Sequence, residues 1–512
     1  MLLTELLTAL PDAVIHGNPH GTDIRSIEYD SRKTGPETGF GIHSVFVCMP
    51  GARLDGHDYA PAMYEKGCRT FLCARRMELP EDACQIVVET PRLALAQMSA
   101  AFYGYPAKEM TIIAITGTKG KTTTAILLSG ILSENGIPCA YIGSNGIDIG
   151  PDHYETVNTT PESRELQRYF RKMSDAGYHH VVMEVSSQAL HTWRVHGLEF
   201  DACLFTNLGE DHISPSEHPS FEDYRDCKRR LFFDYPCRHI VTNADDPHWQ
   251  TVSGNPDIHT LTYAIDTLTH PETGAPVDFT ASDIRPFRSE TALGIEFDCV
   301  THTDGSPVRT PVRLRTPGDF SVYNGLCAMA AATLYGIPPE QSAATLYHMS
   351  IRGRFEIVDA LDGVTFLVDY AHNGMSLENA LTELRRYRPH RLICVFGSIG
   401  GRAQNRRREL AETSARLADI SIITSDNPDN EPPEDIIRDI LSWFDRTRPH
   451  YVIPDREAAV RAAVQMAQPG DIVLLAGKGH ETYQIVNGIK EPFSEKAILL
   501  EEAALVREKA VL

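Results

Sequence analysis

The sequence predicts an α/β protein of three domains. With 512 residues the chain is too long for one core, because domains commonly hold about 100 to 200 residues. Beyond residue 108, apolar strand-like runs alternate with helical stretches, which is typical of mostly parallel sheets. A glycine-rich loop after a buried run marks the first of these units. We therefore predict domains at residues 1–108, 109–350 and 351–512.

The composition excludes several classes of protein. The 48 basic and 69 acidic residues give a net charge of −21, which argues against general affinity for nucleic acid or anionic membranes. No apolar run approaches the roughly 20 residues of a membrane span. The first ten residues resemble an amphipathic helix more than an export signal. The 11 cysteines occur singly, which predicts reduced thiols in a cytoplasmic protein and neither a zinc site nor disulfides.

The first domain shows short strands broken by Gly and Pro. We expect strands at residues 24–29, 44–48, 70–73 and 85–88, and a helix at 91–102 closes the domain. The segments Asp30–Arg32 and Asp55–His57 place polar groups on turns beside these strands. Such loops commonly bind ligands, although the same residues also form ordinary turns.

A phosphate-binding loop opens the second domain. Residues 112–116 predict a buried strand, Gly117–Gly120 a tight turn and Lys121 the start of a helix. Backbone N–H groups, the helix N-terminus and the lysine would converge on an anion, and the Thr122 hydroxyl can hold Mg²⁺. Ile115 stands where the usual P-loop pattern has its first glycine. The alternative is a strand–turn–helix connection without a ligand.

Two further strands of this domain end in polar residues. Residues 178–184 predict a strand that ends in Glu184, and the strand at 202–207 precedes His212. Ligands gather at the carboxyl ends of parallel strands, so Glu184 and His212 could hold Mg²⁺ there. A helix cap or a surface charge is the alternative for Glu184. Residues 250–315 predict a less regular β excursion without evident chemistry.

The third domain repeats this pattern. Strands are predicted at residues 365–368, 391–396, 420–424 and 471–476. A polar cluster follows each strand, at Asp369–Asn373, Gly397–Arg402, Ser425–Asn430 and Gly477–Glu481. One such cluster is usually just a turn, but several in register are hard to explain as structure alone.

Taken together, these motifs resemble the Mur ligase family of ATP-dependent amide-bond ligases. The likeness is greatest to the MurE type, which adds the third residue to UDP-N-acetylmuramoyl-L-Ala-D-Glu in peptidoglycan synthesis. It covers nearly the whole chain, at Asp30–Arg32, Gly117–Thr122, Asn158–Pro161, Glu184–Ser187, Asn207, Asp211–His212, Asn243–Asp246, Tyr323–Asn324, Gly353–Glu356, Asp369–His372, Asp426–Pro428 and Gly477–Glu481. The resemblance implies a small uridine-nucleotide domain, a central P-loop-like ATPase domain with a mostly parallel sheet, and a Rossmann-like C-terminal domain.

The resemblance also implies a site for ATP and Mg²⁺. The residues expected at ATP are Gly117, Thr118, Lys119, Gly120, Lys121, Thr122, Thr123, Asn243, Asn324, Arg354 and Asp369. The expected metal ligands are Thr122, Glu184, His212 and Lys228, the last as a carbamate that would supply an anionic oxygen. Lys121, Glu184, His212 and Lys228 are the expected catalytic residues, while an exposed helix lysine is the alternative for Lys228.

The expected partners are the UDP-muramoyl dipeptide and a free amino acid, bound by a monomer with no nucleic acid or membrane. Ser31 and the Asp55–His57 loop resemble the uridine end of the site. The residues expected at the dipeptide are Asn158, Thr159, Thr160, Ser187 and Arg194, and those at the amino acid are Asp426, Asn427, Asp429, Gly477 and Glu481.

The implied chemistry follows from charge. The D-Glu carboxylate attacks the γ-phosphoryl group of ATP, while Lys121, the loop amides and Mg²⁺ neutralise the developing charge. The amino group then attacks the resulting acyl phosphate and expels phosphate. Because this intermediate hydrolyses in open water, we expect the third domain to close over the second before transfer.

The added amino acid depends on Asp429. Diaminopimelate-adding enzymes have an arginine after the Asp-Asn-Pro motif, where its guanidinium pairs with the distal carboxylate. Asp429 would repel that carboxylate, and Asp429 or Glu431 could attract the ε-ammonium of lysine. The sequence therefore favours L-lysine, with meso-diaminopimelate as the alternative. Asp429 could instead cap the helix predicted at 433–444 without contacting a ligand.

Two departures from the family pattern leave other functions open. The segment Asp211–His218 is longer than usual, so the place of His218 is in question, and Gly401 stands where an Asp commonly precedes Arg402. Either change could mark a divergent ligase with another acceptor, such as a folate-polyglutamate or cyanophycin-type enzyme. A nucleotide-binding protein without ligase activity is an alternative of another class, although the intact lysines, glutamate and histidine argue against it.

Overall fold

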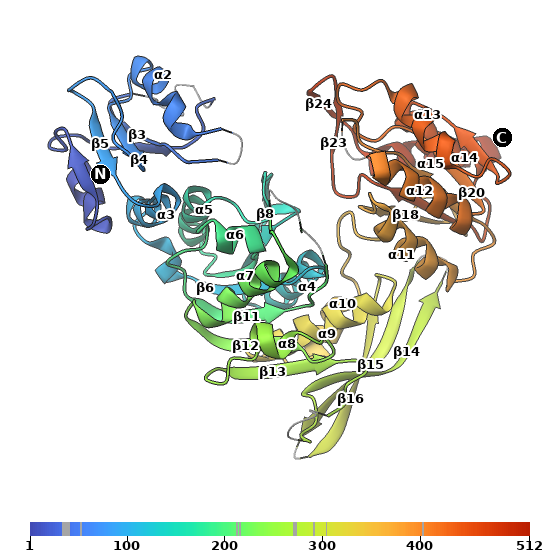
Figure 1. Cartoon of the computed structure of the whole chain (residues 1–512). Helices are drawn as coiled ribbons and strands as arrows, with labels where there is room; N and C mark the ends of the chain where they lie inside the picture. Colours follow the sequence, from blue (N-terminus) through green and yellow to red (C-terminus); the bar gives the residue numbers. More distant parts are fainter. Residues whose placement is uncertain are drawn as a thin grey trace. The chain divides into compact units, whose positions relative to one another are not determined.

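The computed structural model describes residues 1–32, 41–51, 54–210, 213, 217–269, 274–289, 292–303, 305–401 and 404–511 (Figure 1). The chain divides into two compact units, one of Met1–Asp278 with Ala330–Ile337 and one of Phe279–Met329 with Pro338–Leu512. No helix in the described ranges is both long and apolar enough to cross a membrane.

The first unit begins with a five-stranded sheet in the order β1-β5-β4-β3-β2. Its strands are β1 (Val14–His16), β2 (Ser26–Glu28), β3 (Ser44–Val47), β4 (Thr70–Cys73) and β5 (Cys84–Val87). Strands β2 to β5 pair in parallel, and β1 runs antiparallel to β5. The helices are α1 (Leu3–Leu6), α2 (Ala60–Glu65) and α3 (Pro91–Phe102), with 3-10 turns at Leu7–Ala9, Gly56–Tyr59 and Pro106–Glu109. The four strands and the closing helix predicted here are confirmed.

The second sheet of this unit carries the phosphate loop. Its strands follow the order β13-β12-β11-β6-β10-β7-β8-β9, and all from β13 to β7 are parallel. They are β6 (Thr111–Thr116), β7 (Cys139–Gly143), β8 (Gly146–Ile149), β9 (Asp152–Tyr154), β10 (His180–Glu184), β11 (Phe200–Phe205), β12 (Cys237–Asn243) and β13 (His259–Ala264). The helices are α4 (Lys121–Glu134), α5 (Ser163–Asp175), α6 (Ser187–His191), α7 (Phe221–Phe233) and α8 (Trp249–Ser253). β6 lies between β11 and β10, and its apolar residues are buried on both faces, as a continuous apolar run predicts for a strand of a parallel sheet.

The second unit begins with three long antiparallel strands. These are β14 (Phe279–Arg288), β15 (Leu293–Thr303) and β16 (Ser306–Leu314), and helices α9 (Asp319–Thr333) and α10 (Pro339–Leu346) follow them. The prediction of a less regular excursion was wrong for these strands. Buried Ile295, Phe297 and Cys299 alternate with less buried Glu296 and Asp298 along β15, a period of two that the sequence itself carries.

A six-stranded sheet completes the second unit, in the order β17-β18-β22-β19-β20-β21. Its strands are β17 (Glu356–Val358), β18 (Thr365–Asp369), β19 (Leu392–Phe396), β20 (Ile420–Ile423), β21 (His450–Val452) and β22 (Ile472–Ala476), and all but β17 are parallel. The helices are α11 (Gly374–Arg385), α12 (Gln404–Leu417), α13 (Pro433–Trp443), α14 (Arg456–Met466) and α15 (Glu495–Val511). A separate hairpin joins β23 (Tyr483–Val486) to β24 (Ile489–Pro492). The strands predicted for the third domain are confirmed.

Candidate active site

The phosphate loop folds as a tight turn between β6 and α4. Gly117 and Gly120 have φ of +148° and +85°, a region that favours glycine. A Cβ on Gly117 would collide with Thr206 Oγ1. Lys121 bends back over the loop, and its Nζ donates to the carbonyls of Gly117 at 2.9 Å and Thr118 at 3.0 Å. The loop therefore has the strand, turn, helix and lysine that the sequence predicts.

The end of β11 braces this loop from the neighbouring strand. The N–H of Lys119 donates to Asn207 Oδ1 at 2.9 Å, and Asn207 Nδ2 donates to the Lys119 carbonyl at 3.1 Å. Thr206 Oγ1 donates to the same carbonyl at 2.7 Å. These bonds hold the loop in shape without using the Thr122 or Thr123 side chains.

Lys228 lies under the loop and not on the helix surface. Lys228 is 1% exposed, its Nζ donates to the Gly117 carbonyl at 2.9 Å, and the same Nζ lies 4.6 Å from the centre of the Tyr224 ring. Burial of an ammonium group in contact with a phosphate loop disfavours the alternative of an exposed helix lysine.

Glu184 ends β10 as a fully buried carboxylate. Its Oε1 accepts from Tyr141 Oη at 2.8 Å and from the Ser144 N–H at 2.9 Å. Among the described residues, its Oε2 accepts only from Ser144 Oγ, at 3.4 Å, and no Lys or Arg pairs with it. Burial, together with Glu184, raises the pKa of Tyr141 well above its usual value, so that hydroxyl stays a donor.

A buried carboxylate without a cationic partner fits a metal ligand. The hydroxyl of Thr122 and the carboxylate of Glu184 are hard oxygen donors of the kind that Mg²⁺ takes. The predicted ligand His212 lies outside the described residues. Within the described ranges no three His, Cys, Asp or Glu side chains cluster as a metal site.

The segment predicted to hold the dipeptide rests on the end of β10. Thr160 Oγ1 donates to the Glu184 carbonyl at 2.9 Å, and the Thr159 hydroxyl lies 2.9 Å from Ser144 Oγ. Arg194 Nη1 donates to the Thr160 carbonyl at 3.0 Å. Asn158 is half-buried and Ser187 is buried at the start of α6. All five residues thus belong to the first unit, around one strand end.

The predicted uridine-binding residues Ser31 and His57 make hydrogen bonds within the fold. Ser31 is half-buried and its carbonyl accepts from Lys66 Nζ at 3.4 Å. His57 is buried, with Nδ1 2.5 Å from Asp55 Oδ1 and Nε2 accepting from the Ala74 N–H at 2.9 Å. The His57 N–H and Arg75 help to lower the pKa of Asp55 to about 2. Both ring nitrogens of His57 are thus used within the fold, so its ring cannot offer them to a ligand.

The residues predicted to approach adenine are both buried. Asn243 ends β12, where its Nδ2 donates to the Thr206 carbonyl at 2.9 Å and its Oδ1 accepts from the Asp245 N–H at 3.1 Å. Asn324 lies in α9 in the other unit. Since its amide is used to shape the strand end, Asn243 positions the segment that follows it.

Arg354 and Asp369 lie together in the second unit. Asp369 Oδ2 accepts from the Phe355 N–H at 2.8 Å. Burial raises the pKa of Asp369, and the nearby Arg354 guanidinium partly offsets that rise. The guanidinium also stands 5.2 Å from the centre of the Tyr370 ring. The carboxylate therefore fixes the Gly353–Glu356 turn, with Arg354 beside it.

Four residues predicted to bind the amino acid, Asp426, Asn427, Gly477 and Glu481, lie together after β20 and β22. A Cβ on Gly477, which has φ +118°, would lie 2.9 Å from Asp426 Oδ2. Buried Lys478 joins the group, because its Nζ donates to Asn427 Oδ1 at 2.6 Å and to Glu481 Oε2 at 3.0 Å. The polar clusters predicted to follow these strands therefore do lie together.

Asp429 and Glu431 differ in the hydrogen bonds that they make within the fold. Asp429 has φ +54°, and its backbone pairs with the hairpin through the Ile485 carbonyl at 2.9 Å and the Asn487 N–H at 2.7 Å. Glu431 accepts from Arg407 at 2.9 Å and 2.6 Å and from the Gly401 N–H. The suggestion that Glu431 could attract a lysine ammonium is therefore not supported, since that carboxylate already has a guanidinium. Asp429 is four residues before α13 and does not cap it, because Pro432 is at the N-cap.

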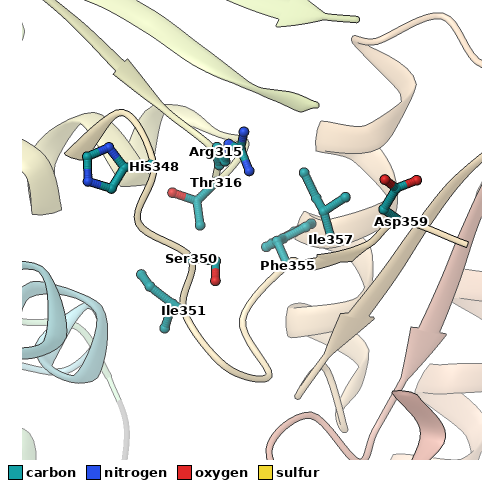
Figure 2. A pocket seen from close by; sticks show the side chains of 8 residues that line it. All are labelled: Arg315, Thr316, His348, Ser350, Ile351, Phe355, Ile357 and Asp359. Carbon is teal, nitrogen blue, oxygen red and sulfur yellow. The ribbon is translucent and has the colours of Figure 1, made fainter. Parts of the chain in front are cut away.

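A cavity of about 380 Å³ lies elsewhere in the second unit (Figure 2). It is lined by Arg315, Thr316, His348, Ser350, Ile351, Phe355, Ile357 and Asp359. None of the predicted site residues is among them, and its walls mix charged, polar and apolar side chains.

Several residues of the site were missed in the sequence. Tyr141 and Ser144 hold Glu184, and Tyr224 contacts Lys228. In the second unit, fully buried Arg456 donates to the carbonyls of Ser425 and Ala476 and pairs with Glu495. The tyrosine and serine near the end of a strand were the available signal for the first group. No local pattern marks Arg456, whose partners come from distant segments.

Comparisons with known proteins match this arrangement. The model of the Mur ligase middle domain matches residues 115–332, and that of the Mur ligase glutamate ligase domain matches residues 353–479. A UDP-N-acetylmuramoyl-L-alanyl-D-glutamate–2,6-diaminopimelate ligase of Geobacillus kaustophilus is 38% identical, over 97% of this chain and 98% of its own length. The chain belongs to the Mur ligase family. A relative of the same name from Clostridium botulinum is 36% identical to this Mur ligase, over 98% of the chain and 99% of the relative.

Solved structures agree with the family. A structure of a UDP-N-acetylmuramoyl-L-alanyl-D-glutamate–2,6-diaminopimelate ligase matches this Mur ligase with a TM-score of 0.67 and 26% identity, covering 98% of this chain and 99% of the other. The ADP complex of the Thermotoga maritima MurF ligase shares the fold, with a TM-score of 0.55 and 18% identity over 95% and 97% of the two chains. The expected α/β fold and the expected activity of an ATP-dependent, ADP-forming ligase are confirmed.

Proposed function

We propose that this Mur ligase joins an amino acid to the D-Glu residue of UDP-N-acetylmuramoyl-L-Ala-D-Glu, using ATP and Mg²⁺, through an acyl phosphate. The observation that carries the proposal is the phosphate loop beside the buried Glu184 carboxylate, which has no described cationic partner. Lys121 and the loop N–H groups would hold the phosphates, as the dipole of α4 favours an anion there. Magnesium, when bound by Thr122 and Glu184, would add positive charge beside the transferred phosphoryl group.

We propose meso-diaminopimelate as the amino acid. Relatives that match nearly the whole chain at 34–38% identity are named for 2,6-diaminopimelate, which supports the alternative of the sequence analysis better than L-lysine. Asp429 is compatible with this acceptor, because the distal carbon of diaminopimelate carries an ammonium group as well as a carboxylate. The aspartate would pair with that ammonium, which L-lysine shares, and another cation would be needed for the carboxylate.

The cellular location and the oligomeric state stay proposals. All 11 cysteines are unpaired thiols, which is typical of proteins from a reducing compartment, so we propose a cytoplasmic enzyme. We also retain the prediction of a monomer, and light scattering of the purified protein at several concentrations would test it.

A phosphate-release assay tests the proposed function. Purified protein with ATP and MgCl2 receives the UDP-muramoyl dipeptide together with meso-diaminopimelate, L-lysine or no amino acid. We expect phosphate release to need the UDP substrate and to be fastest with diaminopimelate. Release that ignores the UDP substrate would contradict the reaction, and faster release with L-lysine would contradict only the choice of acceptor.

A further inference from the structure

Three polar side chains form a hydrogen-bonded chain between α6 and α7. His218 Nε2 lies 2.9 Å from Ser187 Oγ, and His218 Nδ1 lies 2.7 Å from Asp223 Oδ2. The imidazole is fully buried and Ser187 is buried too, whereas the Asp223 side chain is 41% exposed. The three residues are thus aligned in the order Asp223, His218, Ser187.

The partners of His218 fix its tautomer. A carboxylate only accepts hydrogen bonds, so Nδ1 carries the proton and donates to Asp223. In the neutral imidazole Nε2 is then an acceptor, and the Ser187 hydroxyl donates its hydrogen bond to it. Asp223 lies in the first turn of α7, where the helix dipole favours its negative charge.

The serine lies just beyond the carboxyl end of β10, a strand of the sheet that carries the phosphate loop. It follows Glu184 by three residues, and its carbonyl accepts from Cys227 Sγ at 3.0 Å. The next residue of α7, Lys228, donates to the Gly117 carbonyl of the loop. Ser187 therefore lies at the same end of the sheet as the groups proposed to activate the carboxylate.

A purely structural link between two helices does not require this arrangement. Burying an imidazole, a hydroxyl and part of a carboxylate costs free energy that apolar side chains would not cost. The arrangement instead leaves a hydroxyl whose proton is already directed to a base. Such a hydroxyl can accept a proton from a donor outside and pass its own inward.

We propose that Ser187, His218 and Asp223 form a proton relay for the amide-bond step, an inference that rests on the proposed function. The neutral amino group of the acceptor attacks the acyl phosphate carbonyl. The new C–N bond forms, and the C–O bond breaks as its electron pair leaves with phosphate. One N–H proton passes to Ser187 Oγ, while the serine proton passes to His218 Nε2.

The relay returns to its starting state without a further reactant. The imidazolium formed on His218 is balanced by the Asp223 carboxylate, and it gives its extra proton back through Ser187 to the departing phosphate or to water. Ser187 is the member that touches the reacting nitrogen. His218 and Asp223 act through it, as positioning residues for its proton.

The test separates the two half-reactions in His218→Gln and in Ser187→Ala. Acyl phosphate formation is measured without amino acid, by reducing the intermediate with borohydride and quantifying the alcohol by mass spectrometry. Amide formation is measured in a single turnover with the amino acid. We expect the amide step to slow by about 10²- to 10³-fold in both variants. Because Ser187 is also a predicted dipeptide contact, acyl phosphate formation is measured at saturating UDP-muramoyl dipeptide, where we expect it to change less than about threefold.

Two variants complete the design. His191 lies on α6 with its ring 6.2 Å from that of His218 but is exposed, so His191→Gln is the matched control and should keep both rates. Asp223→Asn retains the size of the side chain, removes its charge and should slow the amide step by at least about tenfold. Thermal unfolding midpoints report whether either histidine variant is less stable.

The outcomes distinguish the inference from the function on which it rests. Equal slowing of both half-reactions, or an unchanged amide step in either Ser187→Ala or His218→Gln, overturns the relay. Should His218→Gln fail to fold, Ser187→Ala decides, because it keeps the His218–Asp223 bond. If the unmodified protein forms no acyl phosphate with the UDP-muramoyl dipeptide, the proposed function itself is wrong.

Discussion

At the scale of single residues, the local chemistry of a side chain decides whether it can serve a ligand. His57 and Glu431 have motif-like positions, but the partners inside the fold already use their hydrogen-bonding groups. Glu184 is the reverse case, because within the described part of the chain one of its oxygens has only a long bond to Ser144. Burying such a carboxylate is unfavourable unless a cation binds it. A substitution of Glu184 therefore tests the metal proposal directly.

Glu184→Gln should remove metal binding without disturbing the fold. The glutamine carbonyl can accept from Tyr141 and Ser144, while its NH2 group replaces Oε2 and repels a cation. We expect the MgCl2 concentration for half-maximal phosphate release to rise by at least about tenfold. Exposed Glu199→Gln is the control and should behave like the unmodified enzyme. An unchanged Mg²⁺ requirement in Glu184→Gln would exclude this carboxylate as a ligand.

Asp429→Asn should weaken binding of the amino acid alone. Asparagine tolerates the left-handed backbone at φ +54°, and the backbone bonds to the hairpin remain. Loss of the charge that would pair with the distal ammonium should raise KM for diaminopimelate and for L-lysine by about tenfold, as expected for one charge-assisted hydrogen bond. Steady-state kinetics at saturating ATP measures this effect. A lower KM for diaminopimelate would show that Asp429 repels its carboxylate, as the sequence analysis argued.

At the scale of elements, the parallel strands could be predicted from the sequence, but the side-chain hydrogen bonds between distant segments could not. The strands β6, β18, β19 and β22 are buried on both faces and therefore read as continuous apolar runs. The polar clusters after them were predictable from the common direction of parallel strands. Glu184 lies 43 residues after its partner Tyr141, and His218 lies 31 residues after Ser187. No local pattern in the sequence encodes contacts between residues so far apart.

Arg456 is the clearest case of such a link. Its guanidinium, at the start of α14, donates to the carbonyls of Ser425 after β20 and Ala476 at the end of β22, and pairs with Glu495 of α15 at 2.8 Å. Both the arginine and Glu495 are buried, and burial raises the pKa of Glu495 even though Arg456 opposes that rise. One side chain therefore holds the two strand ends that carry the proposed acceptor residues.

Arg456→Met should destabilise the second unit by about 3–5 kcal/mol, because it leaves the Glu495 carboxylate buried without its partner. The KM for the amino acid should also rise, since the two loops lose their common donor. Arg438→Met on α13 is the control. Its partner Asp435 is exposed, as is Arg438 itself, so we expect a cost of at most about 1 kcal/mol. Urea unfolding measures both variants, and equal losses would contradict a special role for the buried pair.

At the scale of the whole molecule, the division into two compact units predicts how the chain unfolds. The residues around the phosphate loop have their core in the first unit, and the proposed acceptor residues have theirs in the second. Separate cores commonly unfold as separate cooperative transitions. We therefore expect at least two transitions in scanning calorimetry. A non-hydrolysable ATP analogue with MgCl2 should raise the transition of the first unit through binding to its phosphate loop. Arg456→Met should lower only the other transition, and Lys121→Ala should abolish the upward shift without moving that second transition. A single transition that all three changes move together would show that the units unfold as one.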